Sequence, residues 1–128
     1  MYKYFISAIF FSLHLTGSAS AQFIARQHTV KDLNNGTNWL RCSVGQAWDP
    51  KLNTCTGKIV KLDHSQIAYA ITEAKRQLGG NWRLPTHAEL ESLICLACPP
   101  PKINSKYFPN ISPEAYWTSD KNALNPKT

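Results

Sequence analysis

The chain has 128 residues, 43% of them hydrophobic, and a formal net charge of +6 at pH 7. This length suits one small domain with a thin core and disfavours tandem domains. The positive charge indicates either a solvated basic surface or a face that attracts polyanions, and nucleic acid is not expected because no recognition motif is present. The basic residues are scattered along the chain: Arg26, Lys31, Arg41, Lys51, Lys58, Lys61, Lys75, Arg76, Lys102 and Lys106.

Residues 1–21 are typical of a secretory signal peptide. One Lys precedes an apolar run over residues 4–15, and small residues at Ala19 and Ala21 predict cleavage before Gln22. The apolar run is too short to cross a bilayer, and no longer one follows. We therefore expect an exported, soluble chain without a transmembrane segment, located in the periplasm, at the cell surface or outside the cell.

Two strands joined by a tight turn are expected at the start of the mature chain. Residues 22–29 form a short lead-in, and a strand follows near Thr29 to Leu33. Asn35-Gly36 suits a two-residue hairpin turn, because both residue types tolerate positive φ. The second strand, over residues 38–42, would bring Trp39 and Leu40 toward the core.

Four cysteines in a small exported domain favour two disulfides, with three pairings open. We favour Cys42 with Cys55, because Gly45 and a turn at Asp49 can bring the ends of this segment together. Cys95 and Cys98 then pair by elimination.

The Cys-x-x-Cys spacing also occurs in redox proteins and zinc sites. A redox dithiol needs a thiolate at a helix N-terminus, whereas Cys95 and Cys98 follow a helical segment and precede three prolines. Zinc would need two more ligands, and His64 and His87 form no such pattern. We therefore expect a structural disulfide, no metal and no cofactor, and keep a redox protein as an alternative.

A brief β-like segment at residues 57–62 precedes the clearest helix in the chain. Asp63 is a predicted N-cap with Gln66 at the third position, and Gly79 ends the helix. Apolar residues recur on one face at helical spacing: Ile67, Ile71, Ala74 and Leu78.

The segment NWRLPTHAELESL predicts a strand-to-helix corner. Leu84 is extended because it precedes Pro85, and Thr86 and Glu89 form a capping box. Arg83 has no local structural reason, so we expect a carboxylate or carbonyls inside the fold to hold it. The corner consists of Trp82, Arg83, Leu84, Pro85, Thr86 and Glu89, and the buried face of its helix of Leu90, Leu93 and Ile94.

Past the prolines, residues 115–119 predict a last strand, and residues 121–128 form a polar tail. We expect most of the four tryptophans to be buried, because a thin core needs large side chains. No catalytic residue is assigned: a single His at position 64 or 87 is not specific, and the capping box already explains Glu89.

These motifs, taken in order, resemble the DUF1566 family, also called the Lcl C-terminal domain. The matching segments cover residues 30–120 and include VKDLNNGTNWLRCSVGQAWD, TCTG, NWRLPTHAELESL, KINSKYFPN and YWTS. The resemblance implies an α+β, C-type-lectin-like fold, related to formylglycine-generating-enzyme domains, with two helices on small twisted antiparallel sheets. Family domains usually continue with further strands, so we expect a C-terminally truncated member with an open sheet edge.

The family's exported surface modules imply a binding protein rather than an enzyme. We expect an adhesive envelope module that recognises a sulfated glycan, another polyanion or a surface partner, with binding residues unassigned. The alternative is a structural component that forms a homo-oligomer. Asn35 and Asn110 match the glycosylation pattern, to which we give little weight because the pattern is common.

Overall fold

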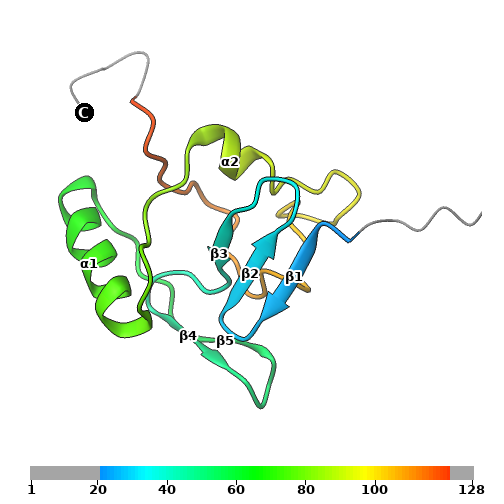
Figure 1. The fold of residues 1–128 in the computed structure, drawn as a ribbon, viewed down its shortest axis with the longest axis horizontal. Coiled ribbons are helices and arrows are strands. Elements are labelled where there is room, and N and C mark those ends of the chain that lie inside the picture. The colour runs from blue at the N-terminus through cyan, green and yellow to red at the C-terminus, as the bar shows by residue number, and fades with distance from the viewer. Residues whose placement is uncertain (1–20, 122–128) are drawn as a thin grey trace, which may run out of the picture.

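The computed structural model describes residues 21–121. All but the last residue of the predicted signal peptide, and all but the first residue of the predicted polar tail, lie outside this described part. The described chain forms two small antiparallel sheets and two helices (Figure 1), which confirms the predicted α+β class.

Three strands form the larger sheet, antiparallel and in the order β1-β2-β3. Their bounds are Phe23–Arg26 for β1, Thr29–Asp32 for β2 and Asn38–Leu40 for β3. Strand β1 lies within the segment that we expected to be only a lead-in. Because Phe23 is buried in the core, the folded unit begins before residue 30.

The hairpin of β2 and β3 is confirmed, but its connection is wider than the two-residue turn we predicted. Residues 33–37 join the strands, and the Asp32 N–H donates to the Thr37 carbonyl at 2.8 Å. The Asp32 carboxylate, fully buried, accepts hydrogen bonds from the Asn34 N–H and the Asn35 side-chain amide, both at 2.9 Å. These bonds stabilise the longer loop, because an Asp side chain can replace a backbone acceptor in a turn.

A second hairpin, which we did not predict, lies largely within the loop that the first disulfide closes. It pairs β4, Gln46–Asp49, with β5, Thr54–Gly57. The β-like segment expected at residues 57–62 is wrong, since β5 ends at Gly57 and residues 58–63 have no regular secondary structure. At Gly57, φ is +101°, a conformation that a β-branched residue would resist.

The first helix forms as the capping pattern predicts. A 3-10 turn, η1 (His64–Gln66), leads into α1 (Ile67–Leu78), and the Asp63–Gln66 capping box is present. Gly79 follows the helix with φ at +68°.

The second helix, α2 (His87–Glu91), begins with the predicted Thr86–Glu89 capping box. It ends at Glu91, earlier than its apolar pattern predicts. Leu93 is buried in the core, but Ile94 no longer lies on the same helical face; it is 54% exposed, and the prediction that it is buried is wrong.

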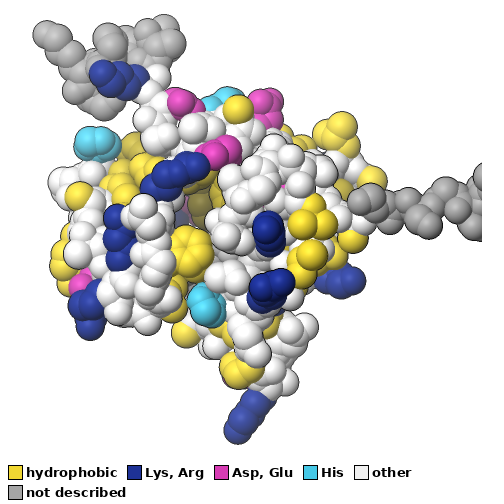
Figure 2. Space-filling model, viewed as in Figure 1, with side chains coloured by type: hydrophobic (Ala, Val, Ile, Leu, Met, Phe, Trp, Pro, Cys, Tyr) yellow, Lys and Arg dark blue, Asp and Glu magenta, His cyan; other side chains and the backbone are white. Residues whose placement is uncertain are grey.

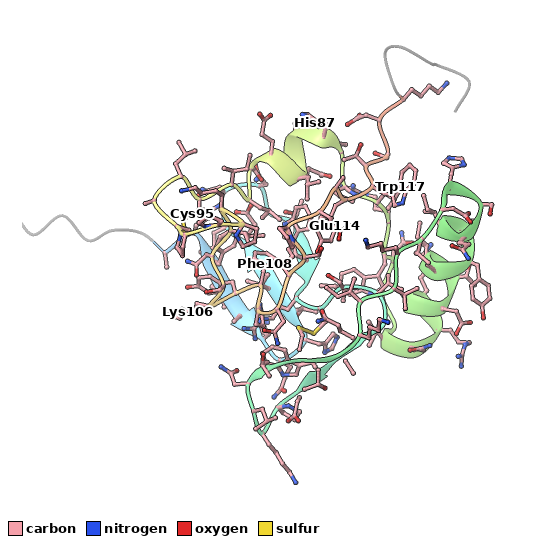
Figure 3. All side chains as sticks on the ribbon, turned by 180° about the vertical axis from the view of Figure 1, so that it is seen from behind. His87, Cys95, Lys106, Phe108, Glu114 and Trp117 are labelled. Carbon is pink, nitrogen blue, oxygen red and sulfur yellow. A yellow bond between two sulfur atoms is a disulfide. The ribbon has the colours of Figure 1, made fainter. Side chains whose placement is uncertain are left out.

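The core is small and lies on the inner face of the three-stranded sheet. Its buried members are Phe23, Val30, Leu93 and Phe108, and the Phe23 ring meets the Phe108 ring edge-on at 5.8 Å. The segment over residues 103–111 supplies Phe108 and covers this face, opposite the solvent-facing side of the sheet (Figure 3).

The expected last strand and the expected burial of the tryptophans are both wrong. Residues 115–119 form no strand, although the Ser119 N–H donates to the Pro85 carbonyl at 2.8 Å. None of the four tryptophans is buried, and Trp117 is 46% exposed. Phenylalanine and aliphatic side chains fill the core instead, while the indole N–H groups of Trp39, Trp82 and Trp117 donate to oxygen atoms outside it.

Candidate functional site

The corner before α2 is a local structure rather than a site. Residues 81–86 form no strand, so only the helix half of the predicted strand-to-helix corner is confirmed. Arg83 binds both oxygens of the Glu89 carboxylate, at 2.7 and 2.9 Å, so a carboxylate does hold this arginine as we expected. The pair lies at the surface and not inside the fold, because the Arg83 side chain is 62% exposed. The hydrogen bonds from Arg83 and from the Thr86 N–H lower the pKa of Glu89 to about 2.

The arginine that is held inside the fold is Arg41, which we had counted among the scattered basic residues. It is 5% exposed and donates to the carbonyls of Gln27, Lys106 and Tyr107 at 2.8 to 3.0 Å. Its guanidinium also lies 3.9 Å from the centre of the Trp48 ring. Burial lowers the pKa of Arg41, but the guanidinium stays charged at neutral pH.

A cleft with a volume of about 1690 Å³ lies between α1 and the three-stranded sheet. Figure 2 shows this hollow, with apolar side chains exposed in it. The α1 wall carries Ile67, Ile71, Ala74 and Leu78, and the sheet wall includes Trp39 and Leu40. The apolar face predicted for α1 therefore exists, but it borders an open cleft.

The segment over residues 111–117 lines part of the cleft beside the start of α1. The Trp117 indole donates to the Leu62 carbonyl at 2.8 Å, just before α1, and Lys61 pairs with Glu114 at 2.6 Å. Figure 3 shows Glu114 and Trp117 on this segment, on the side that faces α1. These contacts hold the start of α1 in place, while the helix itself packs against no strand.

The outer face of the sheet, turned to solvent beside the cleft, is basic. The register sets Lys31 opposite Ile24 and Arg26 opposite Thr29, so Arg26 and Lys31 are diagonal neighbours on this face. Neither cation forms a salt bridge within residues 21–121.

Most carboxylates in the described part of the chain already bind a neighbouring cation or backbone N–H group, or are buried. Glu73, Glu89 and Glu114 form ion pairs with Arg76, Arg83 and Lys61. Asp32 is buried, and Asp49 and Asp63 accept backbone N–H groups. In Figure 2 the visible acidic side chains gather mainly around α2, whereas Lys and Arg side chains lie on both sides of the hollow. The acidic groups therefore leave the outer sheet face uncompensated.

Both predicted disulfides are present, Cys42–Cys55 and Cys95–Cys98. The second lies in turns after α2 has ended, not at a helix N-terminus. Between residues 21 and 121 no three His, Cys, Asp or Glu side chains gather where a metal could bind. His64 and His87 are both exposed.

The two glycosylation motifs have structural roles. The Asn35 side-chain amide donates to Asp32 and Ser92, and the Asn110 amide donates to Thr54 and to the Cys55 carbonyl. Both amides thus join segments that are distant in the sequence.

The fold defines a small α+β domain stapled by two disulfides, with a cleft beside a basic sheet face. A family model described as the Lcl C-terminal domain matches residues 28–128, and the chain belongs to this family. No curated protein and no solved structure matches the chain. Two disulfides are typical of a domain that folds in an oxidising, extracytoplasmic compartment, and no helix in the described part is long and apolar enough to cross a membrane.

Proposed function

We propose that this domain is an exported adhesive module that binds a sulfated glycan through the outer face of its three-stranded sheet. The observation that carries the proposal is the pair of neighbouring cations, Arg26 and Lys31, which have no carboxylate partner among the described residues. His28 lies in the turn between β1 and β2, beside this pair. Two fixed cations at strand spacing attract a chain of sulfates more strongly than isolated charges do.

The arrangement of the acidic residues supports the same proposal. Most Asp and Glu side chains cap helices, form ion pairs with other residues or are buried. The exposed acidic side chains visible in Figure 2 lie mainly around α2, so they lower the positive potential there rather than at the sheet face. The sheet face also carries Ile24 and Leu40, whose apolar surfaces lie beside the cations and can contact the rings of a glycan.

A heparin column tests this proposal. The double variant Arg26→Ser/Lys31→Ser should elute at clearly lower salt than the wild type, because it loses both sheet cations. The matched control, Lys51→Ser/Lys75→Ser, removes the same charge from the β4–β5 loop and from α1 and should elute near the wild type.

Chemically desulfated heparin provides the second comparison, and the wild type should not be retained on it. Equal elution of the two double variants would show that retention follows net charge alone and would contradict a site on the sheet.

A further inference from the structure

The free edge of β3 presents unused backbone groups to the cleft. The Arg41 N–H donates to the His28 carbonyl, and the Thr37 carbonyl accepts from the Asp32 N–H. The backbone N–H and C=O groups of the odd-numbered residues 37, 39 and 41 therefore point toward β2. Those of Asn38 and Leu40 point away from β2, toward the free edge. No hydrogen bond to these groups is formed within residues 21–121.

Across the cleft, α1 offers an apolar wall without a partner. Ile71 and Ala74 line the cleft, and Leu78 is 45% exposed. Among the described elements, α1 makes contacts only with the η1 turn that precedes it. A helix with one apolar face normally buries that face against another element.

The size of the cleft indicates the kind of occupant. Its volume of about 1690 Å³ exceeds the range of roughly 300–1,000 Å³ that is usual for pockets that bind small molecules. A strand edge on one side and an apolar wall on the other suit an extended peptide, because main-chain hydrogen bonds and alternate side chains can be satisfied together. A glycan ring can contact single apolar side chains, but a glycan has no ladder of backbone N–H and C=O groups that could pair with the edge of β3.

Charge argues for a partner polypeptide rather than a second copy of this chain. Lys58 lines the cleft and forms no salt bridge in the part of the chain that the structure describes. A second copy carries the same excess of positive charge, +6 for the whole sequence, and would be repelled. An apolar segment with an acidic residue complements the cleft instead.

We propose that the cleft binds an extended segment of a partner polypeptide, apolar at alternate residues and carrying an acidic residue near Lys58, which adds as a fourth strand to β3. The cleft borders the proposed glycan-binding face, because Arg26, His28 and Leu40 also line it, whereas the α1 wall lies outside that face. The peptide proposal does not depend on glycan binding.

The probes are fluorescein-labelled nonapeptides in which Val, Leu or Phe alternates with Thr, each made with and without one Glu. Fluorescence anisotropy with the mature chain should find binding, and the peptides with Glu should bind more tightly. Lys58→Ser should remove that preference. The same peptides, N-methylated at alternate residues, should bind at least tenfold more weakly, because they keep their side chains but cannot pair with β3.

Matched variants of α1 test the other wall. Ala74→Glu places a charge in the cleft and should weaken peptide binding at least tenfold. Ala68→Glu makes the same change at an exposed position outside the cleft and should leave binding unchanged. Circular dichroism of both variants checks that α1 is intact, and heparin retention checks that the glycan face is unaffected.

Hydrogen exchange locates the contact. Bound peptide should slow exchange of the Asn38 and Leu40 amides. Failure of every peptide to bind, equal binding of the N-methylated peptides, or unchanged exchange of the Asn38 and Leu40 amides would overturn the proposal. Sedimentation that shows a dimer in the wild type but not in Ala74→Glu would also overturn it, since a second copy would then fill the cleft.

Discussion

The guanidinium of Arg41 joins parts of the chain that are far apart in the sequence. Its hydrogen bonds reach Gln27, in the turn after β1, and Lys106 and Tyr107, in the segment that covers the core. Its flat face rests on Trp48 of β4. One planar group with several donors can satisfy all these acceptors at once, which a lysine cannot do.

We predict that Arg41→Ala lowers the free energy of unfolding by about 3 kcal/mol, because it leaves three part-buried carbonyls without this donor and removes the buried side chain. Urea denaturation followed by tryptophan fluorescence measures the change. Arg41→Lys should recover only part of the loss.

Arg26→Ala is the control for the Arg41 variants, since it removes an exposed arginine and should change stability by no more than about 0.5 kcal/mol. An Arg41→Ala variant as stable as this control would show that the carbonyls find other donors.

At the scale of elements, the two helices differ in what holds them. The start of α2 is tied by a capping box and by the Arg83–Glu89 pair, and the segment after it places Leu93 in the core. The helix α1 is longer, yet among the described helices and strands it contacts only η1, and the Trp117 hydrogen bond near its start goes to Leu62, which precedes the helix. The local capping of α1 therefore sets where it begins and ends, but not what its apolar face touches.

The corner before α2 should contribute stability that depends on pH. The pKa of Glu89 is about 2 in the folded chain and about 4.3 in an unfolded one. Because the folded pKa is the lower one, the contribution is present above about pH 4.3 and is lost as the pH falls toward 2.

We predict that Arg83→Ala raises the pKa of Glu89, since the hydrogen bond from Arg83 is the largest cause of the shift and only the interactions with Thr86 then hold the pKa down. Titration of the Glu89 side-chain carboxyl carbon by NMR measures it. Arg76→Ala, which breaks a similar exposed pair on α1, should leave the pKa of Glu89 unchanged. An unshifted midpoint in Arg83→Ala would instead assign the low pKa to the capping box.

For the whole molecule, a core of four buried hydrophobic residues makes the disulfides important. The Cys42–Cys55 bond closes the longer loop, with a sequence separation of 13, and Cys55 is itself 2% exposed. The Cys95–Cys98 bond spans only 3 residues. In the chain-entropy model a longer loop restricts the unfolded chain more.

We predict that Cys42→Ala/Cys55→Ala costs about 3 kcal/mol of stability and Cys95→Ala/Cys98→Ala about 2 kcal/mol. The first loss is a large part of the stability of a small domain, about 5–15 kcal/mol. Thermal unfolding of the two double variants shows which of them loses more stability. The reverse order would mean that loop length does not govern the effect.

Several features could be predicted from the sequence because they depend on residues close together in the chain. Each capping box spans four residues, and the Cys42–Cys55 loop contains its own turn. The β2–β3 hairpin was also predicted, although the carboxylate of Asp32 widened its turn. The strands β4 and β5 were missed, because four-residue strands with little apolar alternation carry a weak signal.

The sequence by itself determined where both helices begin, where α1 ends, both disulfide pairs and the family. Only the tertiary structure decided that Arg41 is buried while Arg83 is exposed, that no tryptophan fills the core, and that α1 faces a cleft. Local backbone hydrogen bonds and short loops are settled within a few residues, so the sequence pattern reveals them. Burial depends on which distant segments meet, such as Gln27, Arg41 and Tyr107, and that is decided only when the whole chain folds.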